Sequence, residues 1–214
     1  MRALLLDFRG TIAALIVGLA IIICSKEYAL QNFILLLIFL VISVIVTKYK
    51  HIEKRARGLY EHERGWQNVI SNGLVPVLCV VMYAFTGMKV LLSMYICALA
   101  AASADKFGSE LGVLSGKPIS LKNFKRVSPG VSGAISLLGT LMSFIGALAI
   151  GTTAYFLYRF DPFVIFTVAV IGFVGGFADT LAGILEEEGV GNKSTSNIIG
   201  IGVGAIIGYL IKII

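Results

Sequence analysis

Long apolar runs constrain this chain more than any other feature of its sequence. The runs are roughly 15 to 25 residues long, and they lack the two-residue alternation of a barrel strand. The chain is 57% hydrophobic and only 14% charged, with a mean hydropathy of +0.92, well above the balance of a soluble domain. We therefore expect an all-α fold, a polytopic transmembrane helical bundle.

Seven runs are candidate membrane spans of a single transmembrane domain covering residues 1–214. They are residues 11–23, 30–46, 68–85, 90–104, 131–158, 162–185 and 197–214. The first run is short for a bilayer and could lie tilted or at the interface. Six spans therefore remain the alternative.

The basic residues give the expected orientation, because Lys and Arg in short loops resist translocation. With seven spans and a cytoplasmic N-terminus, only four of the 18 Lys and Arg residues fall outside, namely Lys26, Lys89, Arg159 and Lys212. The long links 47–67, 105–130 and 186–196 then all face the cytoplasm. We expect a multi-pass protein of the cell membrane with its active site on that side.

Charge and cysteine usage exclude some partners. The net charge of +6 is explained by this topology and by anionic headgroups, so membrane lipids are expected partners and nucleic acid is not. Cys24, Cys79 and Cys97 lie in or at the end of apolar runs, without CxxC or His spacing. Neither a disulfide nor a zinc site is indicated.

Ionisable residues gather where the fourth run ends, in the sequence SADKFGSELG. Asp105 and Ser109 share a helical face if the helix continues for one more turn, and Glu110 then sits beside them. The sixth run contains a similar element, GGFADTLAGILEEE, which carries Asp179. Magnesium typically takes one or two carboxylates and leaves its other positions to water and phosphate. The two helix ends could hold a metal between them. Solvated helix ends are the alternative, although an unpaired carboxylate at Asp179 is costly in a membrane.

The link between the fourth and fifth runs is basic. It contains Lys117, Lys122, Lys125 and Arg126, followed by the turn SPGVSG with Gly130 and Gly133. We expect this turn to open the fifth helix, where glycines allow close approach of the backbone and the helix N-terminus favours an anion. The segment suits a polyphosphate, although it is not a P-loop. Positive-inside residues that meet only headgroups are the alternative.

Two further patterns have structural and functional interpretations. Gln67, Asn68, Ser71 and Asn72 place a polar stripe on one face of the third helix, which could join helices or recognise a base or phosphate. Glycines recur in the last three runs and indicate close helix packing. Those from Gly200 to Gly208 also fit a homodimer interface.

The run ASADKFGSELGVLSGKPISLKNFKRVSPGVSGAISLLG resembles the signature of a membrane family whose plant member is phytyl-phosphate kinase of the vitamin E pathway. Those sequences have an Ala-Asp-Thr-x-x-Ser-Glu-x-Gly core and a basic Pro-Gly-x-x-Gly-Gly segment. The likeness extends upstream to Gln67 and Asn72 and downstream to Asp179. Two positions depart from the pattern: Lys106 stands in place of the Thr, and Ala134 in place of the second Gly of the turn.

The resemblance implies a kinase that converts a prenyl monophosphate, of the phytyl or geranylgeranyl type, to the diphosphate. Kinship to polyprenol kinases and cytidylyltransferases favours CTP as the nucleoside triphosphate, with Mg2+ as cofactor. In this hypothesis Asp105, Glu110 and Asp179 hold magnesium, Lys106, Lys122, Lys125 and Arg126 neutralise phosphates, and Ser109, Gln67, Asn68, Asn72, Gly130 and Gly133 position the substrates. The alternatives are a CTP-dependent lipid cytidylyltransferase and a transporter or non-catalytic membrane protein.

Overall fold

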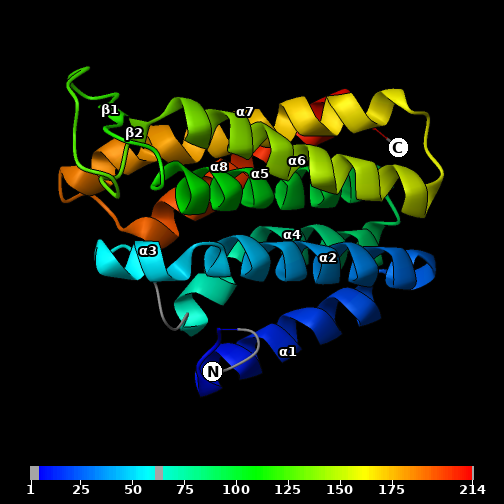
Figure 1. Ribbon diagram of the computed structural model, residues 1–214. Helices are drawn as coiled ribbons and strands as arrows, with labels where there is room; N and C mark the ends of the chain where they lie inside the picture. Colours follow the sequence, from blue (N-terminus) through cyan, green and yellow to red (C-terminus); the bar gives the residue numbers. More distant parts are fainter. Residues whose placement is uncertain (1–4, 61–64, 214) are drawn as a thin grey trace.

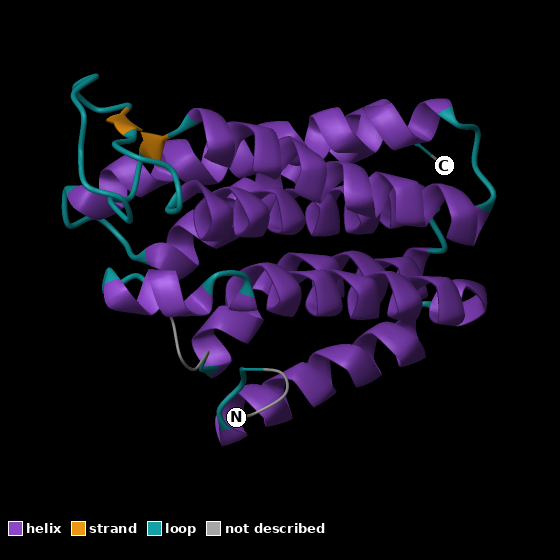
Figure 2. Ribbon diagram, viewed as in Figure 1, coloured by secondary structure: helices purple, strands orange, loops and turns teal. Residues whose placement is uncertain are grey.

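The computed structural model describes residues 5–60 and 65–213 and is mostly helical, as Figure 2 shows. The all-α transmembrane bundle expected from the sequence is confirmed. In chain order the elements are α1 (Phe8–Cys24), η1 (Lys26–Tyr28), α2 (Ala29–Lys48), α3 (His51–Ala56), α4 (Trp66–Thr86), α5 (Val90–Gly112), β1 (Ile119–Ser120), β2 (Ala134–Ile135), α6 (Leu137–Tyr158), α7 (Phe163–Glu187) and α8 (Lys193–Ile211).

Six of these helical segments are long and apolar enough to cross a membrane. The first of the six is Lys26–Lys48, in which η1 runs into α2. Helix α1 is also apolar but has only 17 residues, and it packs against α4 and α2. The structure thus has six long spans and a short first helix. The sequence also indicated that the first apolar run is shorter than the others.

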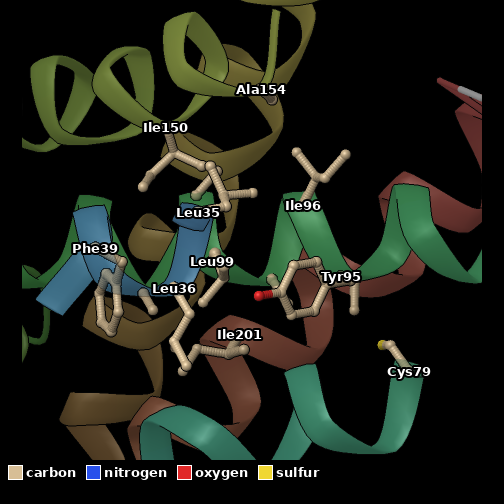
Figure 3. Close-up of a cluster of buried hydrophobic side chains, with 14 of the residues drawn as sticks. Leu35, Leu36, Phe39, Cys79, Tyr95, Ile96, Leu99, Ile150, Ala154 and Ile201 are labelled. Carbon is tan, nitrogen blue, oxygen red and sulfur yellow. The ribbon is translucent and has the colours of Figure 1, made fainter. Parts of the chain in front are cut away.

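Helix α5 forms the centre of the bundle, packed against α4, α6, α7 and α8 (Figure 1). In its most apolar stretch 72% of the residues are buried, against 33 to 39% in the other spans. Side chains of α2, α4, α6 and α8 surround it in the hydrophobic core that Figure 3 shows, among them Leu36, Cys79, Ile150 and Ile201. Residues attached to α5 near its end are therefore held on a rigid element.

Glycines bring α7 and α8 unusually close to α5. A Cβ added at Gly175 would lie 2.5 Å from the Cβ of Ala101, and one added at Gly204 would lie 2.8 Å from the same atom. A Cβ at Gly172 would meet the Cβ of Ala100 at 2.7 Å. These three glycines serve close packing, as the recurrence of glycine in the last runs indicated.

The three long links lie together at one end of the bundle, and the short links lie at the other (Figure 1). The first long link contains a short helix, α3, that the sequence analysis did not predict. Residues 61–64 of this link lie outside the described residues, and so does residue 214 at the end of the last expected span. The residues expected to form the active site thus lie at or near the end of the bundle where the long links meet.

The fifth helix does not begin at residue 131, as we expected from the SPGVSG turn. It begins at Leu137, where Ser136 accepts a hydrogen bond from the amide of Gly139 and caps the helix. The preceding residues pair instead with the start of the loop, because Ile119 and Ser120 form a two-stranded sheet with Ile135 and Ala134. The turn is therefore part of a hairpin and not a helix N-terminus.

Substitution of the packing glycines tests this arrangement. We expect Gly204→Ala to lower the free energy of unfolding by roughly 1 to 3 kcal/mol, because its Cβ would overlap the rigid Cβ of Ala101 and the Cys97 carbonyl. Gly202→Ala on the same helix is the matched control, since a Cβ there meets nothing within 4 Å. The control should be neutral or stabilising by up to about 1 kcal/mol. Reversible unfolding in mixed micelles measures both, and equal effects would contradict the packing model.

Candidate functional site

A cavity of about 450 Å³ opens at the end of the bundle where the long links meet. Its walls come from α4, α5, α6, α7 and α8 and from the loop around β2. Of the residues that the sequence analysis singled out, the cavity is lined by Asn68, Asn72, Asp105, Lys106, Ser109, Glu110, Gly130, Gly133 and Asp179. Residues scattered over more than half of the sequence thus share one space.

Two carboxylates from different helices meet on the wall of this cavity. Asp105 belongs to α5 and Asp179 to α7, and the ammonium of Lys193, the first residue of α8, joins them. Lys193 Nζ lies 2.9 Å from Asp179 Oδ2 and 3.4 Å from Asp105 Oδ1. The two Ala-Asp elements are therefore neighbours in space, with a cation between them that neutralises part of their charge.

Glycines make this meeting possible. A Cβ at Gly176 would lie 3.1 Å from the backbone nitrogen of Asp105, and a Cβ at Gly200 would lie 2.7 Å from the Cβ of Asp179. Larger residues at either position would push α7 away from α5, or α8 away from α7. The close helix packing therefore sets the distance between the acidic groups.

Two oxygen atoms of the site have no partner within the described part of the chain. They are Asp179 Oδ1 and Asn197 Oδ1, both buried and both on residues that line the cavity. A buried oxygen without a hydrogen bond is costly. Each atom is a candidate ligand for a divalent cation, because magnesium and calcium are bound by carboxylate and amide oxygens.

Glu110 lies in a different charge cluster from Asp105 and Asp179. Its Oε2 is 2.9 Å from Lys54 Nζ, while its Oε1 is 2.9 Å from Lys106 Nζ and accepts a 2.9 Å hydrogen bond from Thr47. Across residues 5–60 and 65–213, no group of three His, Cys, Asp or Glu side chains gathers where it could hold a metal ion. The expected set of three carboxylates thus narrows to the pair Asp105 and Asp179.

Lys54 is the buried anchor of this second cluster. Its side chain is 0% exposed, and besides the ion pair it donates hydrogen bonds of 3.0 and 2.7 Å to the carbonyl oxygens of Val46 and Thr47 at the end of α2. Because Lys54 lies on α3 and Glu110 on α5, the cluster ties the first long link to the centre of the bundle.

The basic loop contributes its backbone to the cavity but not its predicted cations. Gly130 and Gly133 lie on the wall with φ of 95° and 68°, and a Cβ at Gly133 would meet Ile184 at 2.8 Å. Lys122, Lys125 and Arg126 are exposed and are not among the lining residues, and Lys122 pairs with Glu188 at 3.0 Å. The backbone of Ser132 also donates to Glu187, so the acidic end of α7 holds the loop in place.

The polar stripe of α4 is divided between the cavity and the helix itself. Asn68 and Asn72 line the cavity, whereas the hydroxyl of Ser71 donates to the carbonyl of Asn68 in the same helix. Gln67 is exposed at the start of α4 and lies outside the lining. Of the three amide side chains that were expected to contact a substrate, Asn68 and Asn72 thus line the cavity and Gln67 does not.

The sequence analysis did not select Lys193 and Asn197 as site residues. Both lie on one face of α8, four positions apart, in the segment NKSTSN that opens the helix. A polar residue one helical turn after a basic residue at a helix start was the available signal. This pattern indicates a site only in combination with the position of α8, which starts beside Asp105 and Asp179.

Comparison with known proteins shows the relationships of the chain. The family model of the integral membrane protein DUF92 matches residues 1–205. Uncharacterized membrane protein MJ0933 of Methanocaldococcus jannaschii is 38% identical over 209 residues, which are 96% of this chain and 85% of that protein. Protein VTE6, chloroplastic, of Arabidopsis thaliana is 24% identical over 220 residues, 97% of this chain and 65% of the plant protein. Uncharacterized membrane protein sll0875 of Synechocystis sp. is 28% identical over 165 residues, 74% of this chain and 60% of that protein. No solved structure matches the chain.

Removal of the buried ammonium tests the role of the Lys54 cluster. We expect Lys54→Met to lower the free energy of unfolding by roughly 3 kcal/mol, because Glu110 loses a buried partner while Lys106 and Thr47 remain. Lys50→Met is the control, since the Lys50–Glu53 pair is exposed, and it should change the stability by less than about 1 kcal/mol. Unfolding curves in mixed micelles measure both changes.

The double variant Lys54→Met with Glu110→Gln separates charge from packing. If the charge matters, the added Glu110→Gln should cost less in the Lys54→Met background than in the wild-type protein. Identical costs in the two backgrounds would show that Lys54 contributes only packing.

Proposed function

The chain belongs to the integral membrane protein family DUF92, and from this premise we propose that it is a kinase that converts a prenyl monophosphate to the diphosphate with a nucleoside triphosphate. The single observation that carries the proposal is the meeting of Asp105 and Asp179 at one ammonium on the wall of a cavity of about 450 Å³. This kind of site suits phosphoryl transfer, which depends on positioning and on charge stabilisation more than on a covalent nucleophile.

One relationship, seen both in a sequence signature and over the whole chain, supports the choice of substrate. The run from ASADKFGSELG to the Pro-Gly turn resembles the signature of the family whose plant member is phytyl-phosphate kinase. The match to the chloroplastic plant protein VTE6 supports this resemblance over 97% of the chain. A prenyl acceptor also suits a cavity at the end of a bundle of membrane-spanning helices, where a lipid phosphate meets water.

Magnesium fits the oxygen atoms of the site. Asp105, Asp179 and Asn197 would hold the ion, which satisfies the two oxygens that otherwise lack partners. When bound, the ion would neutralise charge on the transferred phosphoryl group. Without the ion, the ammonium of Lys193 balances the charge of the carboxylates. Lys193 also lines the cavity, where its ammonium could turn to bind a phosphate.

The remaining residues would bind and orient the reactants. An oxygen of the prenyl phosphate forms a bond to the γ-phosphorus, the bond from that phosphorus to the bridging oxygen breaks, and the nucleoside diphosphate leaves. The acceptor is already ionised at neutral pH, so no general base is needed. Lys106 would offset charge on the acceptor, while Asn68, Asn72 and Ser109 would direct its oxygens.

The exposed cations of the hairpin loop have a separate proposed role. Lys122, Lys125 and Arg126 sit on the same loop as Gly130 and Gly133 but outside the cavity lining. They would attract an anionic nucleotide toward the site from a distance, and salt would weaken this effect. CTP is the nucleotide we propose, by the kinship to polyprenol kinases.

The orientation of the protein also belongs to this proposal. The excess of Lys and Arg at the end with the long links favours the cytoplasmic side of the cell membrane for the active site. Gly200, Gly204 and Gly208 are buried against α5 and α7 within the bundle, so they do not form the homodimer interface that their spacing suggested. A homodimer through another surface stays a prediction.

The assay uses purified protein with Mg2+, CTP and geranylgeranyl monophosphate, with products identified by mass. We expect the diphosphate and CDP, and we expect turnover to stop when EDTA removes the metal. Asp105→Asn and Asp179→Asn should each lower kcat by at least a hundredfold without lowering expression, because each removes a charge that the site needs. Asp161→Asn is the control, since Asp161 is exposed at the opposite end of the bundle and Asn can still cap α7.

Two results would refute the proposal. A CDP-lipid with release of pyrophosphate would identify a cytidylyltransferase instead. Full activity in both Asn variants would show that the carboxylate pair is not part of the reaction.

A further inference from the structure

A second cavity, of about 90 Å³, adjoins the polar one between α1, α2 and α4. Its lining is mostly apolar and includes Val17, Leu36, Phe39 and Leu40. Asn68, Asn72 and Lys106 line both cavities. These three polar residues therefore mark a junction between a charged space and an apolar one.

The small cavity runs from the end of the bundle toward its middle. Its α2 residues extend from Val44 back to Leu36, which corresponds to roughly 12 Å along a helix. Leu36 and Phe39 point into the core region that Figure 3 shows, and they are only 5% and 6% exposed. The apolar space thus follows the direction that a lipid chain would take from a headgroup at the membrane surface.

Small side chains from three helices keep this space open. Ala14 comes from α1, Ser43 from α2 and Gly73 from α4. At Gly73 a Cβ would lie 3.1 Å from Cγ2 of Val17, so even an alanine would push Val17. Ser43 is 3% exposed, and its hydroxyl has no hydrogen-bond partner within the described residues. A larger apolar residue at any of these positions would fill the space, so the small residues preserve a cavity at the expense of packing.

We infer that the small cavity binds the first part of the hydrocarbon tail of the prenyl phosphate, with its phosphate at Lys106, Asn68 and Asn72. This inference rests on the proposed function, because it takes the acceptor to be a prenyl phosphate. The junction favours such a ligand over an ordinary apolar molecule, since only an amphipathic chain with a compact anionic head matches both sides of it. Helices α1, α2 and α4 thereby select the acceptor, while α5, α7 and α8 hold the reacting phosphates.

The first test fills the small cavity. We expect Ala14→Phe to lower the ratio of kcat/KM for geranylgeranyl monophosphate to kcat/KM for CTP at least tenfold, each measured with the other substrate saturating, because the tail loses its space while the nucleotide site is unchanged. Ala20→Phe is the control: the same substitution on the same helix, at a half-buried residue that does not line the cavity, should leave the ratio unchanged. Gly73→Ala is a milder second variant, which moves Val17 and should lower the ratio in the same direction even if Ala14→Phe fails to fold.

The second test does not depend on turnover. A prenyl monophosphate with a diazirine on its tail is irradiated with the wild-type protein, and labelled peptides are identified by mass spectrometry. We expect labels on α1, α2 and α4 next to the small cavity, with competition by geranylgeranyl monophosphate and none by inorganic phosphate or by a bilayer phospholipid.

The two tests separate the inference from the proposed function. Labels at the cavity without any diphosphate product would refute the kinase and leave the tail site standing. Diphosphate product with an unchanged ratio in Ala14→Phe and Gly73→Ala, and with labels elsewhere, would refute the tail site and leave the kinase standing. Equal competition by phospholipid would show a general lipid site and would overturn the inference.

Discussion

The contact of α5, α7 and α8 through their glycines is the constraint on which the rest of the structure depends. Without a side chain at Gly176 and Gly200, α7 approaches Asp105 and α8 approaches Asp179. Two carboxylates this close to one another repel, and burial in a membrane bundle raises the cost of their charge. Lys193 offsets that cost from the first residue of α8, where a lysine can reach both groups.

Helix α5 carries two charge clusters with different roles. Asp105 and Glu110 both line the cavity, but Asp105 shares Lys193 with Asp179 of α7. Glu110, little more than one turn later, is held by Lys54 and Lys106. Lys106 belongs to the Glu110 cluster and also lines both cavities. The structural cluster thus places a cation at the junction, next to the pair of carboxylates that we propose for phosphate chemistry.

The bundle is asymmetric along its axis, and this asymmetry agrees with a reaction at a membrane surface. Short links close one end, while the loop of β1 and β2, the α3 segment and the turn between α7 and α8 gather at the other (Figure 1). The loop is fixed by contacts of Lys122 and Ser132 with the acidic end of α7. The wall that it forms is therefore part of the folded cavity.

The sequence by itself determined the class of fold and indicated that the candidate site residues lie near one end of it. Long apolar runs can only be satisfied as helices in a membrane, and the two Ala-Asp elements end runs that point to the same side. Only the tertiary structure decided which acids become neighbours. In the structure Lys193 bridges Asp179 and Asp105, whereas Glu110 pairs with Lys54. Lys54 lies on α3, a helix that the sequence of the link 47–67 did not predict. The tertiary structure also brought Lys193 and Asn197 to the site and turned the expected helix start at residue 131 into a hairpin. The physical reason is that such contacts depend on the rotation of each helix about its axis and on close packing between distant segments, and neither is encoded in the composition or spacing of a single run.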